Sequence, residues 1–259
     1  MNILEKICNL KKKNIESLKK TISVQELMHK KRKVQKKSFI DSFKKDKLNL
    51  IAEIKKKSPS AGLIRKDFNV IEIAKLYKKA GAECLSILTE KNFFGGNIHF
   101  MDTVKKATNL PILRKDFIID EWQIYESYHH GADCILLIVA ILEDKQIKNY
   151  LNIAKNLNLD VLVEVHNETE TKRAIDLGVK CIGINNRNLK TLKIDLNCFE
   201  KLSKLIPKYT VKIAESGLTQ NKQLLRLRES GADGFLVGEF LLKQKDIFLS
   251  TKELIKNDK

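Results

Sequence analysis

The chain has 259 residues and a formal net charge of +17, with 43% hydrophobic and 31% charged residues. This composition is typical of a soluble globular protein, and no apolar run approaches the ~20 residues that a transmembrane helix needs. The basic N-terminus is not followed by a long apolar stretch, so we expect no signal peptide and a cytoplasmic location. The five cysteines form no CxxC pair, which argues against a disulfide framework and a structural zinc site.

Residues 1–46 are predicted to form a helical extension. Apolar residues recur there at helical spacing and predict two or three short helices. We expect the extension to lie across the rest of the fold and to cover apolar surface. The apolar positions are Ile3, Ile7 and Leu10, then Val24, Leu27 and Met28, then Phe39, Ile40 and Phe43.

The positive charge is concentrated at the N-terminus, where residues 1–47 hold 15 Lys/Arg against 5 Asp/Glu. An RNA-associated protein is one interpretation, and it predicts salt-dependent RNA binding through this segment. Few aromatic residues interleave the charges, and lysines outnumber arginines 42 to 7, so base stacking and forked phosphate contacts have little support. We expect solvated, lysine-rich helical faces and no nucleic-acid partner.

From about residue 47, eight short apolar runs alternate with amphipathic segments of helical spacing, such as 70–80 and 143–157. This alternation predicts parallel βαβ units, and eight units predict a closed (β/α)8 TIM barrel, which usually has about this length. We therefore expect one α/β domain over residues 1–259, with the barrel at 47–259 after the extension at 1–46. The predicted strands are 48–54, 84–88, 110–114, 134–139, 161–165, 181–185, 210–214 and 234–238.

A partial repeat supports the barrel. Gly81, Gly131, Gly178 and Gly231 each precede a predicted strand at intervals of 50, 47 and 53 residues. Each glycine suits the left-handed position that ends a helix. Two smaller domains fit the length as well, and a doubly wound open sheet is the structural alternative. We favour the barrel because no glycine-rich dinucleotide turn follows the first strand.

Charged residues end several of the predicted strands. Barrel active sites are built at the carboxyl ends of the strands, and a charge in an apolar run is costly unless it is paired. We therefore expect these side chains to converge over the barrel mouth and to shift each other's pKa values, as acid–base catalysis requires. A salt-bridge network that only closes the barrel is the alternative. The residues are Glu53, Lys55, Lys115, Glu164 and Glu215.

The loops after the last two strands indicate a phosphate site. Ser216 and Gly217 follow the seventh predicted strand, and Gly238 and Glu239 follow the eighth, which is where barrels commonly bind phosphate. Ordinary turn residues are the alternative. Residues 57–60, with Ser58, are expected to add a mobile lid after the first strand.

Amide and aromatic residues lie at or after the ends of two other predicted strands, the sixth and the second. Asn185 is expected to hold a carboxylate or hydroxyl group, and Arg187 to pair with a pocket carboxylate. Phe94 is a candidate to lie against a flat substrate ring, although ordinary core packing fits it nearly as well. The sequence has no HxxH, HExxH or Cys/His cluster, so we predict no metal site and no cofactor.

Seven segments together resemble the indole-3-glycerol phosphate synthase family, in the order that family has them. The resemblance spans roughly residues 48 to 240, and the N-terminal extension is also similar. KSPS after the first strand, KDF after the third and INNRNL after the sixth are the most specific parts. The segments are AEIKKKSPSAG (52–62), ILRKDFIID (112–120), GADCILLI (131–138), LVEVH (162–166), GINNRNL (183–189), AESG (214–217) and LVGE (236–239).

The resemblance implies a monofunctional carboxy-lyase of tryptophan biosynthesis. Its substrate would be 1-(2-carboxyphenylamino)-1-deoxyribulose 5-phosphate, and ring closure, decarboxylation and dehydration would give indole-3-glycerol phosphate. No second domain is visible, and we expect a monomer that acts on this small molecule without binding a membrane.

The resemblance also implies residue roles. Lys115 would be the general acid, Glu164 the second acid–base group and Lys55 the cation that neutralises the substrate carboxylate. Glu53 and Asn185 would orient the substrate, supported by Arg187 and Glu215. The remaining expected contacts are Ser58, Ser216, Gly217, Gly238 and Glu239 near the phosphate, and Phe94, Phe117, Leu136 and Leu189 around the anthranilate ring.

The chain departs from the family pattern at one position, and one other enzyme class is an alternative. Phe240 stands near a position where many relatives have a small residue, and we expect it to crowd the phosphate loop. A phosphosugar isomerase or epimerase is the nearest enzyme alternative. Those enzymes commonly use a Cys/Asp or two-Asp pair or a metal, whereas lysines and glutamates end these strands.

Overall fold

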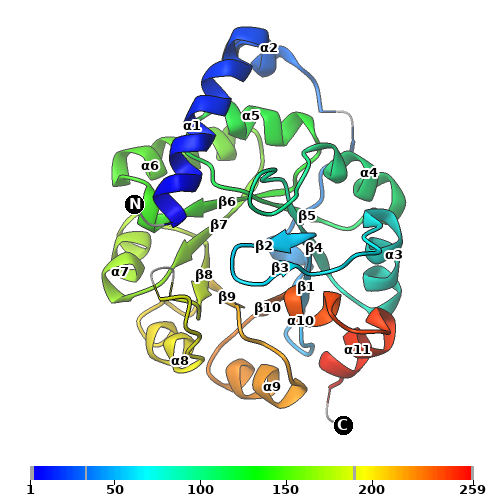
Figure 1. Cartoon of the computed structure of the whole chain (residues 1–259). Helices are drawn as coiled ribbons and strands as arrows, with labels where there is room; N and C mark the ends of the chain where they lie inside the picture. Colours follow the sequence, from blue (N-terminus) through cyan, green and yellow to red (C-terminus); the bar gives the residue numbers. More distant parts are fainter. Residues whose placement is uncertain (1–2, 33, 189–190, 258–259) are drawn as a thin grey trace.

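The chain folds into a closed barrel of parallel strands in this computed structural model, which describes residues 3–32, 34–188 and 191–257. Within these residues the barrel has eight strands, hydrogen-bonded in the order β1-β10-β9-β8-β7-β6-β5-β4 (Figure 1). Because β1 pairs with both β4 and β10, the sheet has no free edge, and the (β/α)8 prediction is confirmed. The strands are β1 (Leu50–Ile54), β4 (Cys84–Leu88), β5 (Ile112–Lys115), β6 (Cys134–Ile138), β7 (Asp160–Val165), β8 (Cys181–Asn185), β9 (Val211–Glu215) and β10 (Gly234–Val237).

Helices surround the strands, and their ends follow local sequence signals. Asn69 caps the first of them by accepting hydrogen bonds from the backbone N–H groups of Ile71 and Glu72. The four repeated glycines all have positive φ, as predicted. The helices are α3 (Val70–Ala80), α4 (His99–Thr108), α5 (Trp122–His129), α6 (Asp144–Asn156), α7 (Glu168–Asp176), α8 (Asn197–Ser203), α9 (Asn221–Glu229), α10 (Glu239–Leu242) and α11 (Ile247–Leu254), with a 3-10 turn η2 (Val139–Ile141) after β6.

Two buried apolar layers arise because successive strand residues face opposite sides of the sheet. In β1, Ala52 and Ile54 pack in the layer between strands and helices, whereas Ile51 faces the barrel interior. Cys84, Cys134 and Cys181, the first residues of their strands, belong to the interior layer. The same alternation lets polar side chains at the other end of the strands face the barrel axis.

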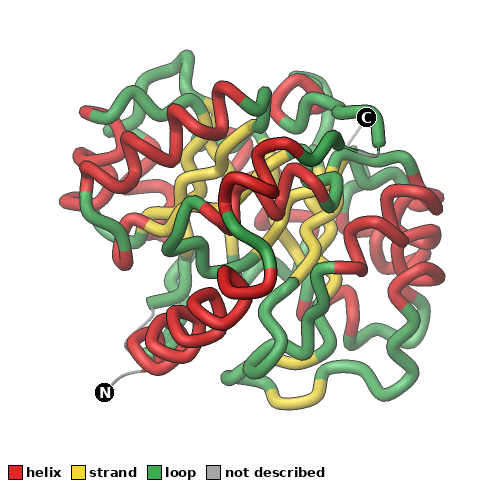
Figure 2. The backbone as a smooth tube through the Cα atoms, turned by 90° about the horizontal axis from the view of Figure 1, so that it is seen from above, coloured by secondary structure: helices red, strands yellow, loops and turns green. Residues whose placement is uncertain are grey.

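The N-terminal extension contacts both ends of the barrel. It comprises α1 (Ile3–Thr21), α2 (Val24–His29) and the 3-10 turn η1 (Ile40–Ser42), so its first helix is long rather than short as predicted. Figure 2 shows α1, next to the N label, at one end of the barrel. Phe39 reaches the opposite end, where its N–H donates to Asp160 at the start of β7 and its ring joins the interior layer.

Residues 57–60, expected to add a mobile lid, are part of a short antiparallel hairpin of β2 (Lys57–Ser58) and β3 (Gly62–Leu63). The hairpin follows β1 directly, and the backbone N–H of Lys57 donates to the carbonyl of Phe94 in the loop after β4.

Among the helices of the described residues, none combines the length and apolar character needed to cross a membrane.

Candidate active site

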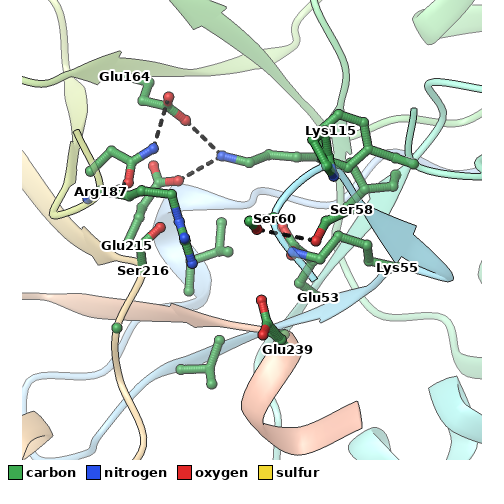
Figure 3. A pocket seen from close by; sticks show the side chains of 18 of the residues that line it. Glu53, Lys55, Ser58, Ser60, Lys115, Glu164, Arg187, Glu215, Ser216 and Glu239 are labelled. Atoms are coloured by element: carbon green, nitrogen blue, oxygen red, sulfur yellow. Dashed lines mark hydrogen bonds and ion pairs between the residues drawn. The ribbon is translucent and has the colours of Figure 1, made fainter. Parts of the chain in front are cut away.

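Lys115 lies at the centre of a cluster of charged side chains at the carboxyl ends of the strands (Figure 3). Its Nζ, at the end of β5, lies 2.7 Å from Glu164 Oε2 on β7 and 2.6 Å from Glu215 Oε2 on β9. Asn185, the last residue of β8, donates its Nδ2 to Glu164 Oε1 at 3.2 Å. Residues distant in the sequence therefore meet around one ammonium group because the strands are parallel and the barrel is closed.

A second ion pair lies on β1 and the residue after it. Lys55 Nζ is 2.5 Å from Glu53 Oε1, so the two side chains share a face as their spacing predicts. Glu53 is buried against Gly238 at the end of β10. A Cβ atom at position 238 would lie 2.7 Å from Glu53 Oε1, so only glycine leaves room for this carboxylate.

The cluster shifts the pKa values of its members in different directions. Burial alone would lower the pKa of Lys115, but Glu164, Glu215 and Glu53 outweigh it and raise the pKa above its usual value. Burial raises the pKa of Glu215, and repulsion from Glu164 adds to this, so that it reaches about 7 despite the nearby Lys115.

Glu164 is held in the ionised form. Burial would raise its pKa, but Lys115 and His166 outweigh burial and keep the pKa well below its usual range. At neutral pH the cluster therefore contains a protonated Lys115, an ionised Glu164 and a partly protonated Glu215. Such a set supplies both a proton donor and a proton acceptor, which general acid–base chemistry requires.

The cluster faces a pocket with a volume of about 410 Å³. One wall is aromatic, because the rings of Phe94 and Phe117 lie 6.0 Å apart with an interplanar angle of 38°. Leu136 adds to the apolar lining, and Ile3 and Ile7 of α1 border the pocket from above the strands. A concave, mostly apolar pocket with a few converging charges is typical of a small-molecule site.

The loops after β9 and β10 form another side of the pocket. Ser216 and Gly217 both have left-handed backbones, with φ of 67° and 81°. A Cβ atom at Gly217 would lie 2.3 Å from Ile194 Cγ2, so this turn requires glycine for space as well as for conformation. Asn186 steadies the loop by donating its Nδ2 to the carbonyl of Glu215 at 3.0 Å and that of Ser216 at 3.3 Å.

Every predicted site residue that the structure describes lines this one pocket, and Leu189 lies outside the described residues. Their roles stay predictions. Arg187 Nη1 donates to the carbonyl of Leu192 at 3.3 Å, and the expected pairing of Arg187 with a pocket carboxylate stays a prediction. Burial would raise the pKa of Glu239, but Lys243, Lys55 and Arg187 together lower it.

Ser58 and Phe240 line the pocket and also make contacts outside it. Ser58 is buried, and its Oγ lies 3.3 Å from Ser60 Oγ while accepting a hydrogen bond from the N–H of Ala61. Phe240 lines the pocket beside Gly238, but its ring also packs against the layer of apolar residues beneath the helices. The expected crowding of the loop after β10 by Phe240 stays a prediction.

Three residues near the cluster were not identified from the sequence. Gly183 on β8 has no side chain, and a Cβ atom there would lie 2.1 Å from Glu215 Oε1. Asp116 follows Lys115 and binds Lys11 of α1 at 2.7 Å, which ties the extension to the site. His166 follows β7 and lies 3.1 Å from Glu164. All three lie in segments that carry the family resemblance, which are ILRKDFIID, LVEVH and GINNRNL, but none of them was assigned a role.

A group of potential metal ligands exists elsewhere in the described chain. His99 and Asp102 of α4 and His130 at the end of α5 have side-chain donor atoms within 4.8 Å of one another. None of the three borders the pocket. His130 Nδ1 and Asp102 Oδ2 lie 2.7 Å apart and form an ordinary hydrogen-bonded pair.

The sequence is similar to proteins of one family along nearly its whole length. A family model described as indole-3-glycerol phosphate synthase matches residues 4–254. A protein of that name from Caldanaerobacter subterraneus subsp. tengcongensis is 47% identical over 244 residues, covering 94% of each chain. Another from Legionella pneumophila is 43% identical over 255 residues, covering 98% of each chain.

Solved structures with low sequence identity share the fold alone. A 3-hexulose-6-phosphate synthase has a TM-score of 0.62 and 18% identity, covering 80% of this chain and 97% of its own. An N-acetylmannosamine-6-phosphate 2-epimerase from Clostridium perfringens has a TM-score of 0.61 and 15% identity, covering 80% and 92%. On the family match and the full-length identities, this chain belongs to the indole-3-glycerol phosphate synthase family.

Proposed function

We propose that the chain converts 1-(2-carboxyphenylamino)-1-deoxyribulose 5-phosphate to indole-3-glycerol phosphate, carbon dioxide and water, a step of tryptophan biosynthesis. The observation that carries this proposal is the position of Lys115, with Glu164 and Glu215 within 2.7 Å of its Nζ on the pocket side of the barrel. A protonated lysine beside an ionised carboxylate suits a reaction that first adds a proton to oxygen and later removes a proton from the ring-closed intermediate.

The pocket has a complementary surface for each part of this substrate. The loops with Gly217 and Gly238 would take the phosphate at one end through backbone N–H groups. The apolar wall of Phe94 and Phe117 would take the anthranilate ring at the other end, where aromatic side chains favour a flat ring. Lys55 would neutralise the substrate carboxylate, with Glu53 fixing the position of its ammonium group.

Ring closure would use Lys115 as the general acid. The ring carbon that bears the carboxylate attacks the ribulose carbonyl, a carbon–carbon bond forms, and the carbonyl oxygen takes a proton from Lys115. The bond to the carboxylate then breaks, carbon dioxide leaves, and its electron pair restores the aromatic ring. The raised pKa of Lys115 keeps this proton in place until negative charge develops on the oxygen.

Dehydration would use Glu164. The new hydroxyl group leaves as water, and the proton lost from the five-membered ring needs a base. The lowered pKa of Glu164 makes its carboxylate available for this proton in the resting enzyme. Glu164 can pass the proton that it takes from the five-membered ring to the departing hydroxyl group, so that water leaves. Solvent then restores the proton that Lys115 gave up during ring closure.

The test is conversion of the synthetic substrate by the purified full chain, followed by the fluorescence of the indole product. We expect turnover with EDTA present. The proton of Lys115 can neutralise the charge that develops on the carbonyl oxygen, so the reaction needs no metal ion for this task. EDTA also removes any ion from the His99, Asp102 and His130 group. Absence of indole product under these conditions contradicts the proposal.

We further propose that the chain acts as a one-domain, cytoplasmic monomer without a nucleic-acid partner. In support, α1 packs through Ile15 against Trp122 of α5, and Lys11 and Lys19 form ion pairs with Asp116 and Asp120. Part of the N-terminal charge is therefore neutralised within the fold. Light scattering should give the mass of one chain. Deletion of residues 1–47 should impair stability or substrate retention. If the deletion changes only RNA affinity, the proposal that the chain has no nucleic-acid partner is contradicted.

A further inference from the structure

His166 connects the candidate base to a second carboxylate outside the pocket. Its Nε2 lies 3.1 Å from Glu164 Oε1, and its Nδ1 lies 3.0 Å from Glu170 Oε2 in the first turn of α7. The side chain is only 9% exposed and does not line the pocket. The imidazole therefore contacts Glu164 without bordering the pocket.

Glu170 is itself held in place. Its Oε2 accepts the backbone N–H of His166 at 2.9 Å, and its Oε1 accepts Nδ2 of Asn167 at 2.7 Å. A carboxylate fixed by two neighbours on the same chain gives the imidazole a defined orientation. From α8, Cys198 Sγ contacts the carbonyl of His166 at 3.7 Å, so the backbone at this position is held as well.

The two carboxylates keep His166 charged. Burial would lower the pKa of His166, but Glu164 and Glu170 outweigh burial and raise it to about 9. Both ring nitrogens then carry protons, and each lies within 3.1 Å of a carboxylate oxygen. Nε2 makes an ion pair rather than a hydrogen bond with Glu164, since it has no hydrogen-bond partner within the described residues.

The charged imidazole of His166 is a second cation, in addition to Lys115, that offsets the negative charge of the carboxylates. Without His166, two carboxylates on β7 and β9 share the single ammonium group of Lys115. Glu164 Oε2 contacts Lys115, whereas Oε1 faces His166 and the side-chain amide of Asn185. Loss of the imidazolium leaves Oε1 with one neutral donor, and it lets Glu164 compete with Glu215 for Lys115.

We propose that His166, held by Glu170, is a positioning residue that fixes Glu164 toward the pocket as an ionised base. His166 does not touch the substrate, and it acts only through Glu164. This inference rests on the proposed role of Glu164 in the lyase reaction.

The first experiment compares steady-state kinetics of His166→Ala, His166→Gln and Glu170→Gln. We expect His166→Ala to lower kcat by about 10²-fold with little change in KM, because misplacement of a reacting group by about 1 Å costs that much. His166→Gln should recover part of the loss, since its amide can donate to Glu164. His130→Ala, which breaks another His–carboxylate pair that is partly buried and lies away from the pocket, should keep wild-type kcat.

The pH profile separates this role from a structural one. In the wild type, kcat should fall as the pH rises through about 9, where His166 loses its proton. This limb should move to lower pH in Glu170→Gln and vanish in His166→Gln. Wild-type kcat and an unchanged alkaline limb in folded His166→Ala and Glu170→Gln would overturn the proposal.

A second readout does not depend on turnover. Titration of the imidazole by ¹⁵N NMR, with His166 assigned from its absence in His166→Gln, should give a pKa near 9 in the wild type and a lower one in Glu170→Gln. An ordinary pKa in the wild type overturns the inference even if the enzyme is active. A raised pKa in a chain that forms no indole product instead contradicts the proposed function.

Discussion

At the residue scale, the absence of a side chain at Gly183 matters as much as the charged groups themselves. The buried carboxylate of Glu215 occupies the space where a Cβ atom would lie 2.1 Å from Oε1. Gly183→Ala must therefore displace Glu215 or the strand, and overpacking of this kind typically costs about 1–3 kcal/mol. We expect a lower melting temperature and a kcat reduced by about 10²-fold, because Lys115 loses one of its two carboxylates.

A suitable control for this variant is Gly178→Ala. Gly178 has φ of +69°, and no atom lies within 4 Å of the position that a Cβ atom would take, so alanine there adds backbone strain alone. We expect this control to lose stability and to keep kcat. If Gly183→Ala also keeps kcat while losing stability, the geometry of Glu215 is not important for turnover.

The charged cluster makes a second prediction at this scale. Lys115→Ala and Glu164→Gln should each lower kcat by about 10²–10⁴-fold, the usual contribution of a general acid or base. Both variants should remain folded by circular dichroism. Lys172→Ala, which breaks an exposed Lys–Glu pair on α7, should have wild-type rates. Near-normal turnover in Lys115→Ala or Glu164→Gln would reassign the proposed roles.

The site could be predicted from the sequence where a residue's position in a strand determined its direction. The period of two placed Glu53 and Lys55 on one face, and the closed barrel then brought Lys115 and Glu164 to the same end. The space that Gly183 leaves for Glu215 could not be predicted from the sequence, because it depends on the packing of the neighbouring strand β9. The hydrogen bond from Arg187 to the carbonyl of Leu192 could not be predicted either, because it depends on the conformation of the following turn.

At the element scale, α1 links the extension to the active site. Ile3, Leu4 and Ile7 border the pocket, and Lys11 Nζ lies 2.7 Å from Asp116 Oδ1, next to Lys115. Asp116 is buried and also binds Arg114, so it keeps one cation if Lys11 is removed. The helix therefore closes one side of the pocket through a small number of contacts.

We expect Lys11→Ala to raise KM for the substrate more than it changes kcat, because α1 loses its buried anchor to the residue beside the general acid. Lys12→Ala, an exposed position on the same helix, is the matched control and should behave as wild type. Steady-state kinetics on both variants check this. Equal KM values for the two variants would mean that α1 does not depend on this ion pair.

The strands were easier to predict than the extension. Strand ends such as Cys84, Leu88, Cys181 and Asn185 match because apolar runs between turn residues are short and unambiguous. In the extension, three apolar patches indicated short helices, but α1 continues through lysine-rich turns that the local pattern does not join. Its docking on α5 through Ile15 and Trp122 is a tertiary contact, which periodicity cannot supply.

At the scale of the whole molecule, the His166 contacts predict a pH dependence of stability. The pKa of His166 rises from 6.5 to about 9 on folding, so its contribution is fully present below pH 6.5 and is lost as the pH rises through 9. The shift corresponds to about 3 kcal/mol. Glu170, whose pKa is lowered because His166 outweighs burial, contributes above pH 4.5 and loses this as the pH falls.

Denaturant unfolding of the wild type and His166→Gln checks this prediction. The difference in the free energy of unfolding between them should be largest between pH 4.5 and 6.5 and should shrink as the pH approaches 9. A difference that stays constant over this range would show that His166 is not charged in the folded protein.

The closed barrel and the common pocket are the basis of the functional account, because they bring Lys115, Glu164 and Lys55 to one space. The most direct measurement is a crystal structure of the chain with indole-3-glycerol phosphate bound. We predict the indole ring against Phe94 and Phe117, the phosphate at Gly217 and Gly238, and Lys115 Nζ facing the ring system. Product bound elsewhere, or Lys115 turned away from it, would contradict the account.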